Sequence, residues 1–278
     1  MSSKPASIHK HILYEASVQD PEVDLALIDR MTNASSGKKA LTLREDFSGT
    51  SVLACAWVAS DPERKAWGVD LHRPTLNWAR KHRLSVLGED QSRVTLLEED
   101  VLRAATPPVD VVAALNFSYM IFKQRELLKS YFQSVYDSLN NAGVFLLDMF
   151  GGPHAQDVMK EKKRVRAGKD FKGTPYPDFT YVWEQASFNA VTQEICCHIH
   201  FKGKKIIPIE KAFIYKWRLW SITEITDLLY EVGFEKVSPY FEGWDDKTES
   251  TDGDLQIRKK YENMLAWICY LSAAKGKG

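Results

Sequence analysis

Residues 43–51 read LREDFSGTS, and residues 65–71 read KAWGVDL. The first stretch has the pattern of a strand that ends in a tight turn at Gly49 and continues into an apolar helix. The second is a strand that ends in a carboxylate, Asp70. A strand, a glycine turn that opens a helix, and a carboxylate after the next strand are typical of a doubly wound sheet that binds an adenosine-type ligand.

The composition narrows the class of protein. The 278 residues suffice for one domain with an insertion, which we prefer to two small domains. Lys plus Arg and Asp plus Glu both number 37, so the chain lacks the basic surplus that attracts nucleic acid. No apolar run reaches the roughly 20 residues that span a bilayer, and the polar start MSSKPASIHKH lacks a signal-peptide core. We therefore expect a cytoplasmic protein with no nucleic-acid or membrane partner, and with reduced, mostly buried cysteines.

Strands and helices alternate in the first half of the chain. Strands are predicted at residues 40–46, 65–70, 94–97, 109–116 and 144–149, and helices at 50–60, 74–86 and 124–139, with Gly143 ending the last helix. The fifth strand, VFLLDM, is apolar throughout, as in a strand covered on both faces. Five strands joined by helical crossovers imply a parallel sheet with right-handed connections.

The second half has a different pattern. The segment 151–172 is charged and glycine-bearing, and its charge run KEKKRVRAGKDFK (160–172) is predicted to be a solvated, mobile lid. Three β-rich runs follow at 180–188, 192–201 and 206–217. Ser221 and Glu224 have capping-box spacing, so a helix should begin there and stop at Gly233. Two final strands are predicted at 234–241 and 265–272.

This order of elements resembles the class I S-adenosylmethionine-dependent methyltransferases of the small-molecule type. Glu45 takes the acidic place of their first motif and Gly49 the middle glycine, whereas Phe47 and Ser51 replace the outer two glycines. Asp70, Asp100 and the segment 116–119 follow the second, third and fourth strands. The correspondence runs from about residue 38 to 273.

The resemblance implies a fold class and a division of the chain. The fold is α/β, a doubly wound, seven-stranded, Rossmann-like sheet with five parallel strands, a closing antiparallel pair, and a β-rich insertion after the fifth strand. Residues 1–38 would be an N-terminal helical cap, 39–150 the cofactor-binding half, 151–218 a substrate cap, and 219–278 the C-terminal part of the sheet.

The resemblance also implies S-adenosylmethionine as cofactor, with S-adenosylhomocysteine as product. Gly49 would meet the methionine end, Asp70 the ribose hydroxyls, and Asp100 with Val101 the adenine. Glu45 would fix the first turn or touch the methionine amine. The simpler alternatives are a tight turn at Gly49, a helix cap at Asp70 and a solvated loop acid at Asp100. The remaining cofactor-binding candidates are Tyr14, Phe47, Leu71, Asn116 and Phe117, and Gln19 is a further closing contact from the N-terminal segment.

The acceptor site is expected at the end of the fourth strand, beneath the insertion. Tyr119 and His198 are the catalytic candidates, and the substrate pocket would comprise Tyr119, Trp183, Tyr215, Trp217 and Arg218. His200 and Glu184 are alternatives to His198 as general base. No metal is expected, because His198 and His200 with Glu210 lack an evident fourth ligand.

The predicted reaction is in-line displacement of a methyl group onto N, O or S of a small-molecule acceptor. Two alternatives stay open: a methyltransferase acting on protein or RNA, and a nonenzymatic S-adenosylmethionine-binding protein. The single glycine in DFSGTS disfavours a nicotinamide dehydrogenase, and the lack of prolines in NFSY (116–119) disfavours methylation of a flipped adenine. The sequence leaves a homodimer open.

Overall fold

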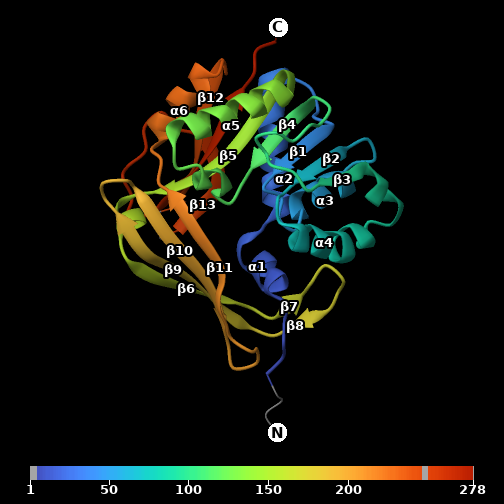
Figure 1. Ribbon diagram of the computed structural model, residues 1–278, viewed down its shortest axis with the longest axis vertical. Helices are drawn as coiled ribbons and strands as arrows, with labels where there is room; N and C mark the ends of the chain where they lie inside the picture. The colour runs from blue at the N-terminus through green and yellow to red at the C-terminus, as the bar shows by residue number, and fades with distance from the viewer. Residues whose placement is uncertain (1–4, 246–249, 278) are drawn as a thin grey trace.

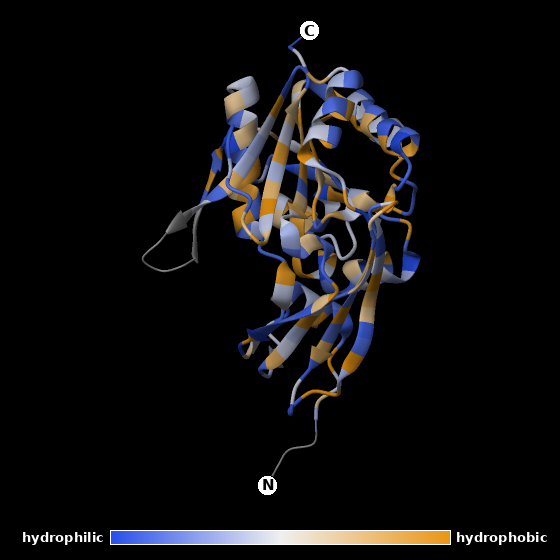
Figure 2. Ribbon diagram, turned by 90° about the vertical axis from the view of Figure 1, so that its left-hand side faces the viewer, coloured by the Kyte–Doolittle hydropathy of each residue, from blue (hydrophilic) through white to orange (hydrophobic). Residues whose placement is uncertain are grey.

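A computed structural model describes residues 5–245 and 250–277. An α/β unit occupies the upper part of the molecule, and a smaller antiparallel sheet lies below it (Figure 1). Hydrophobic residues concentrate on the strands in the middle of the molecule (Figure 2). In the part of the chain that the structure describes, no helix is both long and apolar enough to span a membrane.

The large sheet has the strand order β13-β12-β14-β5-β4-β1-β2-β3. Strands β1 to β5 run parallel, and β12 and β14 pair antiparallel with their neighbours. The bounds are β1 (Thr42–Asp46), β2 (Lys65–Val69), β3 (Val94–Leu97), β4 (Val109–Ala114), β5 (Leu139–Gly151), β12 (Lys236–Asp245), β13 (Ser250–Ile257) and β14 (Trp267–Ala274). The mixed α/β architecture is therefore as predicted.

Two details of the sheet differ from the prediction. Among the described residues, the large sheet has eight strands rather than seven, because β13 adds to the outer edge of β12. Gly143 does not end a helix. Helix α5 (Arg125–Ser138) ends with Leu139 in extended conformation as its C-cap, and Gly143 lies inside β5.

Helices cover both faces of the sheet. Leu27 and Ile28 of α2 (Pro21–Ser36) and Trp57 of α3 (Val52–Ala59) pack in one core with Leu43 of β1. Phe132 of α5 and Leu228 of α6 (Ile222–Glu231) pack in a second core with β4 and β5. The Ser221 and Glu224 capping box is present. Helix α4 (Arg73–His82) follows β2, and short 3₁₀ turns lie at Leu84–Val86, Gly88–Arg93, Ser118–Ile121 and Pro153–Gln156.

The insertion is a four-stranded antiparallel sheet with the order β11-β10-β9-β6. Its strands are β6 (Met159–Val165), β9 (Phe179–Asn189), β10 (Glu194–Lys202) and β11 (Ile209–Arg218), and β7 (Gly168–Lys169) pairs with β8 (Pro175–Tyr176). The predicted mobile lid is therefore wrong over 160–165, because these residues of β6 all pair with β9.

The N-terminal helix α1 (Lys10–Val18) is attached to the insertion, although more than 140 residues separate them. Ala6 forms a β-bridge with Ile206, and Lys10 Nζ donates to the carbonyl of Ala212 at 3.2 Å. Lys163 Nζ donates to the carbonyl of Ser17 at 3.0 Å. Leu13 and residues of the insertion strands form a third hydrophobic core, separate from the two cores of the large sheet. Helix α1 and the insertion sheet thus form one packed unit below the α/β unit (Figure 1).

Candidate active site

The turn after β1 has an alternating left-handed backbone. Phe47, Gly49 and Ser51 have φ angles of 53°, 51° and 56°. These are the positions at which the family pattern has its glycines, so the two non-glycine residues adopt the conformation that glycine adopts without strain. Phe47 is held there by aromatic contacts, with ring centroids 5.9 Å from Phe122 and 5.6 Å from Tyr131. The local geometry of the motif is therefore kept although two of its glycines are replaced.

Asp70 fixes this turn from the end of β2. Its Oδ2 accepts the backbone N–H of Gly49 at 2.8 Å, and its Oδ1 accepts the N–H of His72 at 2.7 Å. The carboxylate therefore positions both the first turn and the start of α4. Each oxygen keeps a further lone pair that a ligand hydroxyl can use.

A buried ion pair supports the same region from beneath. Arg44 Nε donates to Asp46 Oδ1 at 2.6 Å, and the hydroxyl of Tyr131 donates to Asp46 Oδ2 at 2.9 Å. Arg44 also donates to the carbonyl of Val101 at 2.8 Å. Both charged side chains are fully buried. The network ties the end of β1 to the loop after β3 and to α5.

A second left-handed turn follows β4. Asn116 and Phe117 have φ angles of 58° and 59°, and their N–H groups donate to the Asp148 carboxylate of β5 at 3.0 and 2.8 Å. Burial raises the pKa of Asp148 to about 7, although both N–H groups favour its charged form. Asp148 therefore shapes the backbone at the end of β4.

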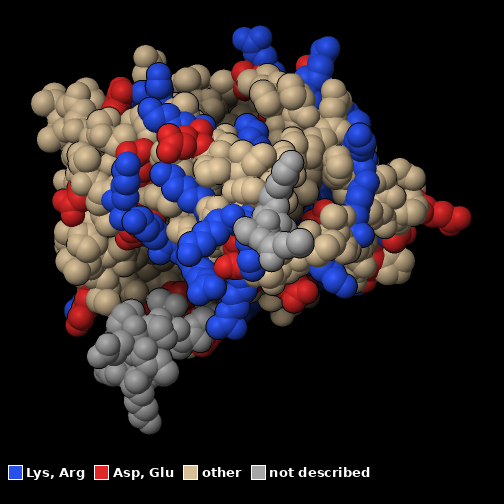
Figure 3. Space-filling view, turned by 90° about the horizontal axis from the view of Figure 1, so that it is seen from below, with Lys and Arg blue, Asp and Glu red and all other residues tan. Residues whose placement is uncertain are grey.

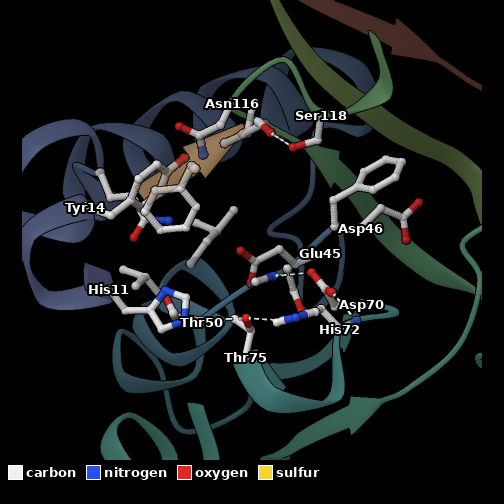
Figure 4. Close-up of a pocket in the computed structure, with 18 of the residues that line it drawn as sticks. His11, Tyr14, Glu45, Asp46, Thr50, Asp70, His72, Thr75, Asn116 and Ser118 are labelled. Carbon is white, nitrogen blue, oxygen red and sulfur yellow. Dashed lines mark hydrogen bonds between the residues drawn. The ribbon is translucent and has the colours of Figure 1, made fainter. Parts of the chain in front are cut away.

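A first cavity of about 500 Å³ opens along these strand ends. It is acidic: Asp24, Glu45, Asp46 and Asp70 line it, and Lys10 is the only lysine or arginine among its described lining residues. Burial raises the pKa of Glu45 to about 8, and its Oε2 accepts the N–H of Ala54 at 2.9 Å. Figure 4 shows Tyr14, His11, Glu45, Asp70 and Asn116 around this space. Such a cavity suits a cationic ligand.

Gln19 provides a polar group that the protein itself does not use. Its Oε1 is buried and has no hydrogen-bond partner among the residues that the structure describes, and Gln19 lines the first cavity. A buried acceptor without a partner costs free energy unless a ligand or water supplies the donor. The first cavity therefore has a place for a ligand donor.

A second cavity of about 600 Å³ lies beneath the insertion. Its walls are aromatic and acidic, with one lysine, Lys163, among its described lining residues. The aromatic residues are Phe117, Phe150, Tyr181, Trp183, Tyr261, Trp267 and Tyr270, and the acidic residues are Asp20, Asp24, Asp148, Glu161 and Glu242.

The two cavities share three lining residues, Asp24, Leu115 and Asn116. Burial raises the pKa of Asp24 to about 7, and the nearby carboxylates of Asp148 and Asp20 raise it further. A carboxyl group that titrates near neutral pH thus lies where ligands of the two cavities would meet.

Solved structures share this architecture, whereas no family model and no curated protein matches the sequence. CalS10, an amino pentose methyltransferase from Micromonospora echinaspora solved with S-adenosylmethionine bound, has a TM-score of 0.67 at 14% identity, covering 98% of this chain and 99% of that one. DesVI of Streptomyces venezuelae has a TM-score of 0.67 at 14% identity, covering 98% and 100%. KedS8, a sugar N-methyltransferase from Streptoalloteichus, has a TM-score of 0.64 at 13% identity, covering 99% and 96%. The chain has the class I methyltransferase fold.

Within this methyltransferase fold, most predicted site residues lie around the two cavities. The first cavity is lined by Tyr14, Glu45, Phe47, Gly49, Asp70, Asn116, Tyr215 and Trp217, and the second by Asn116, Phe117 and Trp183. The structure brings these side chains together from the N-terminal segment, the strand ends and the insertion. Their contacts with a cofactor or acceptor stay predictions.

Tyr119 and Arg218 are not placed where the sequence predicted. Tyr119 is fully buried beside Phe132, and its hydroxyl is without a hydrogen-bond partner in the described part of the chain. Phe117 precedes the 3₁₀ turn in a left-handed conformation, and within that turn the side chains of Tyr119 and Met120 are buried. Arg218 donates to the carbonyl of Lys123 at 3.0 Å and to Glu224 at 3.1 Å, and its guanidinium stacks on Trp220. It therefore holds the end of β11 rather than a substrate.

Four further predicted residues lie outside the described linings of both cavities. His198 of β10 pairs with Glu184 of β9 and hydrogen bonds to it. Neither is among the described residues that line the two cavities, so both lie on the face of the insertion that points away from the cavities. Leu71 is 67% exposed. Asp100 caps its own turn by accepting the N–H of Leu102 at 3.0 Å, and the side chain of Val101 is buried in the core.

Sequence reasoning missed Asp24 and Asp148. Asp148 ends the strand VFLLDM, so its place at the carboxyl end of a parallel strand was a usable signal. Asp24 lies in the first turn of α2, where an acidic residue has an ordinary electrostatic role. Only the packing of α2 against β5 and β4 brings it to the cavities.

Proposed function

We propose that this protein transfers the methyl group of S-adenosylmethionine to an amine of a small-molecule acceptor. The observation that carries the proposal is the meeting of the two cavities at Asp24, Leu115 and Asn116. The first would hold the cofactor and the second the acceptor. A junction between them is the geometry that in-line displacement requires.

The first cavity fits the cofactor on three grounds. Asp70 offers paired acceptors for vicinal hydroxyls, and Gln19 Oε1 offers a buried acceptor for an ammonium or hydroxyl donor. The excess of carboxyl groups suits a molecule that carries both a sulfonium and an ammonium. When bound, S-adenosylmethionine supplies an electrophilic methyl group.

The second cavity favours a cationic acceptor with an apolar body. Aromatic faces attract an ammonium group, and the carboxyl groups of Asp20, Glu161 and Glu242 add to this attraction. Two structural neighbours are described as an amino pentose methyltransferase and a sugar N-methyltransferase, which supports an amine-bearing acceptor.

Asp24 is the proposed general base. An ammonium must lose a proton before its nitrogen can attack the methyl group. A base with a pKa of about 7, such as Asp24, takes up this proton efficiently at neutral pH. Asp148 holds the N–H groups of Asn116 and Phe117 and so keeps the floor of the junction in place. The aromatic walls exclude water from the transferring carbon.

The acceptor class is tested by following the formation of S-adenosylhomocysteine with matched pairs of amino sugars and their hydroxyl analogues. We expect turnover with amines and none with the analogues. Turnover with hydroxyl analogues alone would contradict the amine assignment. Calorimetric titration with S-adenosylmethionine and S-adenosylhomocysteine tests the cofactor separately, and the absence of binding by both would refute the whole proposal.

The role of Asp24 is tested with Asp24→Asn. This variant should lower kcat on the order of 100-fold, as for loss of a general base, and should abolish the fall in rate below about pH 7. Glu22→Gln, an exposed acid in the first turn of the same helix, is the matched control and should leave both unchanged. An unaltered pH profile in Asp24→Asn would assign the proton transfer to another group.

A nucleic-acid substrate is less well supported. Lys and Arg side chains gather on the underside of the molecule, interspersed with acidic ones (Figure 3). Several cations of the insertion are paired with acids: Lys160 with Glu184, and both Arg164 and Lys205 with Asp178. The acidic second cavity would repel phosphate.

A further inference from the structure

The insertion sheet has two faces with different chemistry. Its inner face carries Tyr181 and Trp183, which line the second cavity. Because side chains alternate along strands, Glu184 of β9 and Cys196, His198 and His200 of β10 lie on the opposite face. Among the described residues, these four are absent from the linings of both cavities. They form a separate polar cluster.

Glu184 is the centre of this cluster. Its Oε1 receives Lys160 Nζ at 2.8 Å, while its Oε2 lies 2.9 Å from His198 Nδ1 and 2.8 Å from His200 Nε2. The hydrogen bond from Lys160 is the main cause that lowers the pKa of Glu184 to about 2, and the bond from His198 adds to it. An ionised carboxylate only accepts hydrogen bonds. Both histidine nitrogens that face it therefore carry a proton.

The backbone of β11 settles how His200 is protonated. The N–H of Lys211 donates to His200 Nδ1 at 3.2 Å, so this nitrogen is an acceptor and the ring is neutral. A metal ion on Nε2 would move the ring proton to Nδ1, where it would face the Lys211 N–H. This arrangement favours a hydrogen-bonded cluster over a two-histidine, one-carboxylate metal site, although the three side chains are close enough to bind an ion.

In His198 the two ring nitrogens have exchanged roles relative to those of His200. Its Nδ1–H donates to Glu184, which leaves the lone pair of Nε2 free to accept, and Nε2 lies 3.6 Å from Cys196 Sγ. Cys196 is partly exposed, whereas Cys55, Cys197 and Cys269 are buried. A nucleophile, a base that accepts its proton, and a carboxylate that orients the base are thus aligned in order.

The residues paired with Cys196 on the neighbouring strands include a cation. Lys216 stands directly opposite Cys196 on β11, and Ser187, which is uncharged, stands opposite on β9. Glu194, two residues earlier on β10, is paired with Lys123 Nζ at 2.6 Å. The strand positions opposite Cys196 thus hold no carboxyl group, and the carboxyl group two residues away has its own cation.

We propose that Cys196, His198 and Glu184 form an activated-thiol site that undergoes exchange with small disulfides. The Cys196 proton passes to His198 Nε2, and Glu184 stabilises the resulting imidazolium. The thiolate sulfur attacks one sulfur of the disulfide, a Cys196 mixed disulfide forms as the old S–S bond breaks, and the released thiolate takes the proton from His198. The disulfide is the oxidant, so the electrons balance. The site is independent of methyl transfer.

The test uses the aromatic disulfide 5,5′-dithiobis(2-nitrobenzoate), with the modified residue located by peptide mass spectrometry. We expect one fast equivalent at Cys196, which should react faster at pH 7 than the thiol of N-acetylcysteine. His198→Asn should slow this reaction on the order of 10-fold and change how its rate depends on pH. Glu184→Gln should slow the reaction by a smaller factor.

Glu210→Gln is the matched control, because Glu210 is an exposed acid of the insertion that pairs with Lys202. It should react like the unaltered protein. Near-UV circular dichroism of each variant separates loss of folding from loss of reactivity. Reaction of Cys196 at the rate of N-acetylcysteine across the pH range, or no change in His198→Asn, would overturn the proposal. Binding of one Zn²⁺ per chain that His200→Asn abolishes would replace it with a metal site.

Discussion

The two cavities are built in different ways. In the first, the carboxyl groups are held by hydrogen bonds from the chain itself: Asp70 by Gly49, Glu45 by Ala54 and Asp46 by Arg44. In the second, seven of the described lining residues are aromatic, and five of these come from the insertion and the C-terminal segment. The first cavity is therefore preorganised by the strand ends, whereas most of the aromatic wall of the second is added by segments that follow the fifth strand. Under the proposed function, the parallel sheet would fix the cofactor site and the later segments would shape the acceptor site.

The largest expected effect comes from breaking the support of the first cavity. Arg44→Ala leaves the Asp46 carboxylate buried and unpaired, so it should lower the free energy of unfolding by about 3–5 kcal/mol. Urea denaturation measures the change. Arg30→Ala, which removes an exposed pair with Asp254, should cost less than about 1 kcal/mol. Equal losses in both variants would show that the buried pair has no special role.

The next effect concerns pH. The pKa of Glu45 is raised to about 8 in the fold from 4.5, so the folded state holds its proton more tightly than the unfolded chain. Its contribution to stability is complete below pH 4.5 and is lost as the pH rises to about 8. Glu45→Gln should remove this loss, so near pH 8 it should be more stable than the unaltered protein. Urea denaturation at pH 5 and pH 8 checks this. A stability difference between the two proteins that does not vary with pH would contradict it.

Asp70 offers a test that separates the two cavities. Asp70→Asn removes charge-assisted hydrogen bonds worth about 1.5–3 kcal/mol, so S-adenosylhomocysteine should bind about 10- to 100-fold more weakly. The KM for the acceptor, measured at saturating cofactor, should stay unchanged, because Asp70 lines the first cavity only. Asp90→Asn, an exposed acid paired with Arg93, is the control in calorimetric titrations. Equal weakening of both ligands would refute the separation.

The smallest effect concerns the turn after β1. Ser51 has a φ of 56° and its side chain makes no cap hydrogen bond, so Ser51→Gly should relieve strain and raise stability by about 0.5–1 kcal/mol. Ser130→Gly, in the interior of α5, should instead lower it by a similar amount. Thermal unfolding distinguishes the two signs. A destabilised Ser51→Gly would mean that the Ser51 to Ser48 hydroxyl contact outweighs the strain.

The sequence predicted the parallel part of the sheet well, because its strands are apolar and its helices amphipathic. It did not predict β13, STDGDLQI, or β6, MKEKKRV, which have few apolar residues. Both are edge strands, which are stabilised by pairing with one neighbour rather than by burial.

The site was predicted less completely than the sheet. Strand ends identified Asp70 and Asn116, but the direction of a side chain after a turn depends on backbone angles that a sequence does not show. Tyr119 was misplaced for this reason, since Phe117 turns the chain through a left-handed conformation. Alternation correctly grouped His198 with His200, but it could not tell which face of the insertion looks toward the cavities.

The attachment of α1 to the insertion has a kinetic consequence. Tyr14 and Lys10 of α1 line the first cavity, and Trp183 of the insertion lines the second. The bridge at Ala6 and the hydrogen bonds of Lys10 and Lys163 join α1 to the insertion, and the buried pair of Glu15 with Arg83 joins α1 to the end of α4. The insertion can therefore move outward only if one of these two attachments opens. Under the proposed function, exchange of the spent cofactor and departure of the methylated product would both depend on that opening, and their rates would rise and fall together.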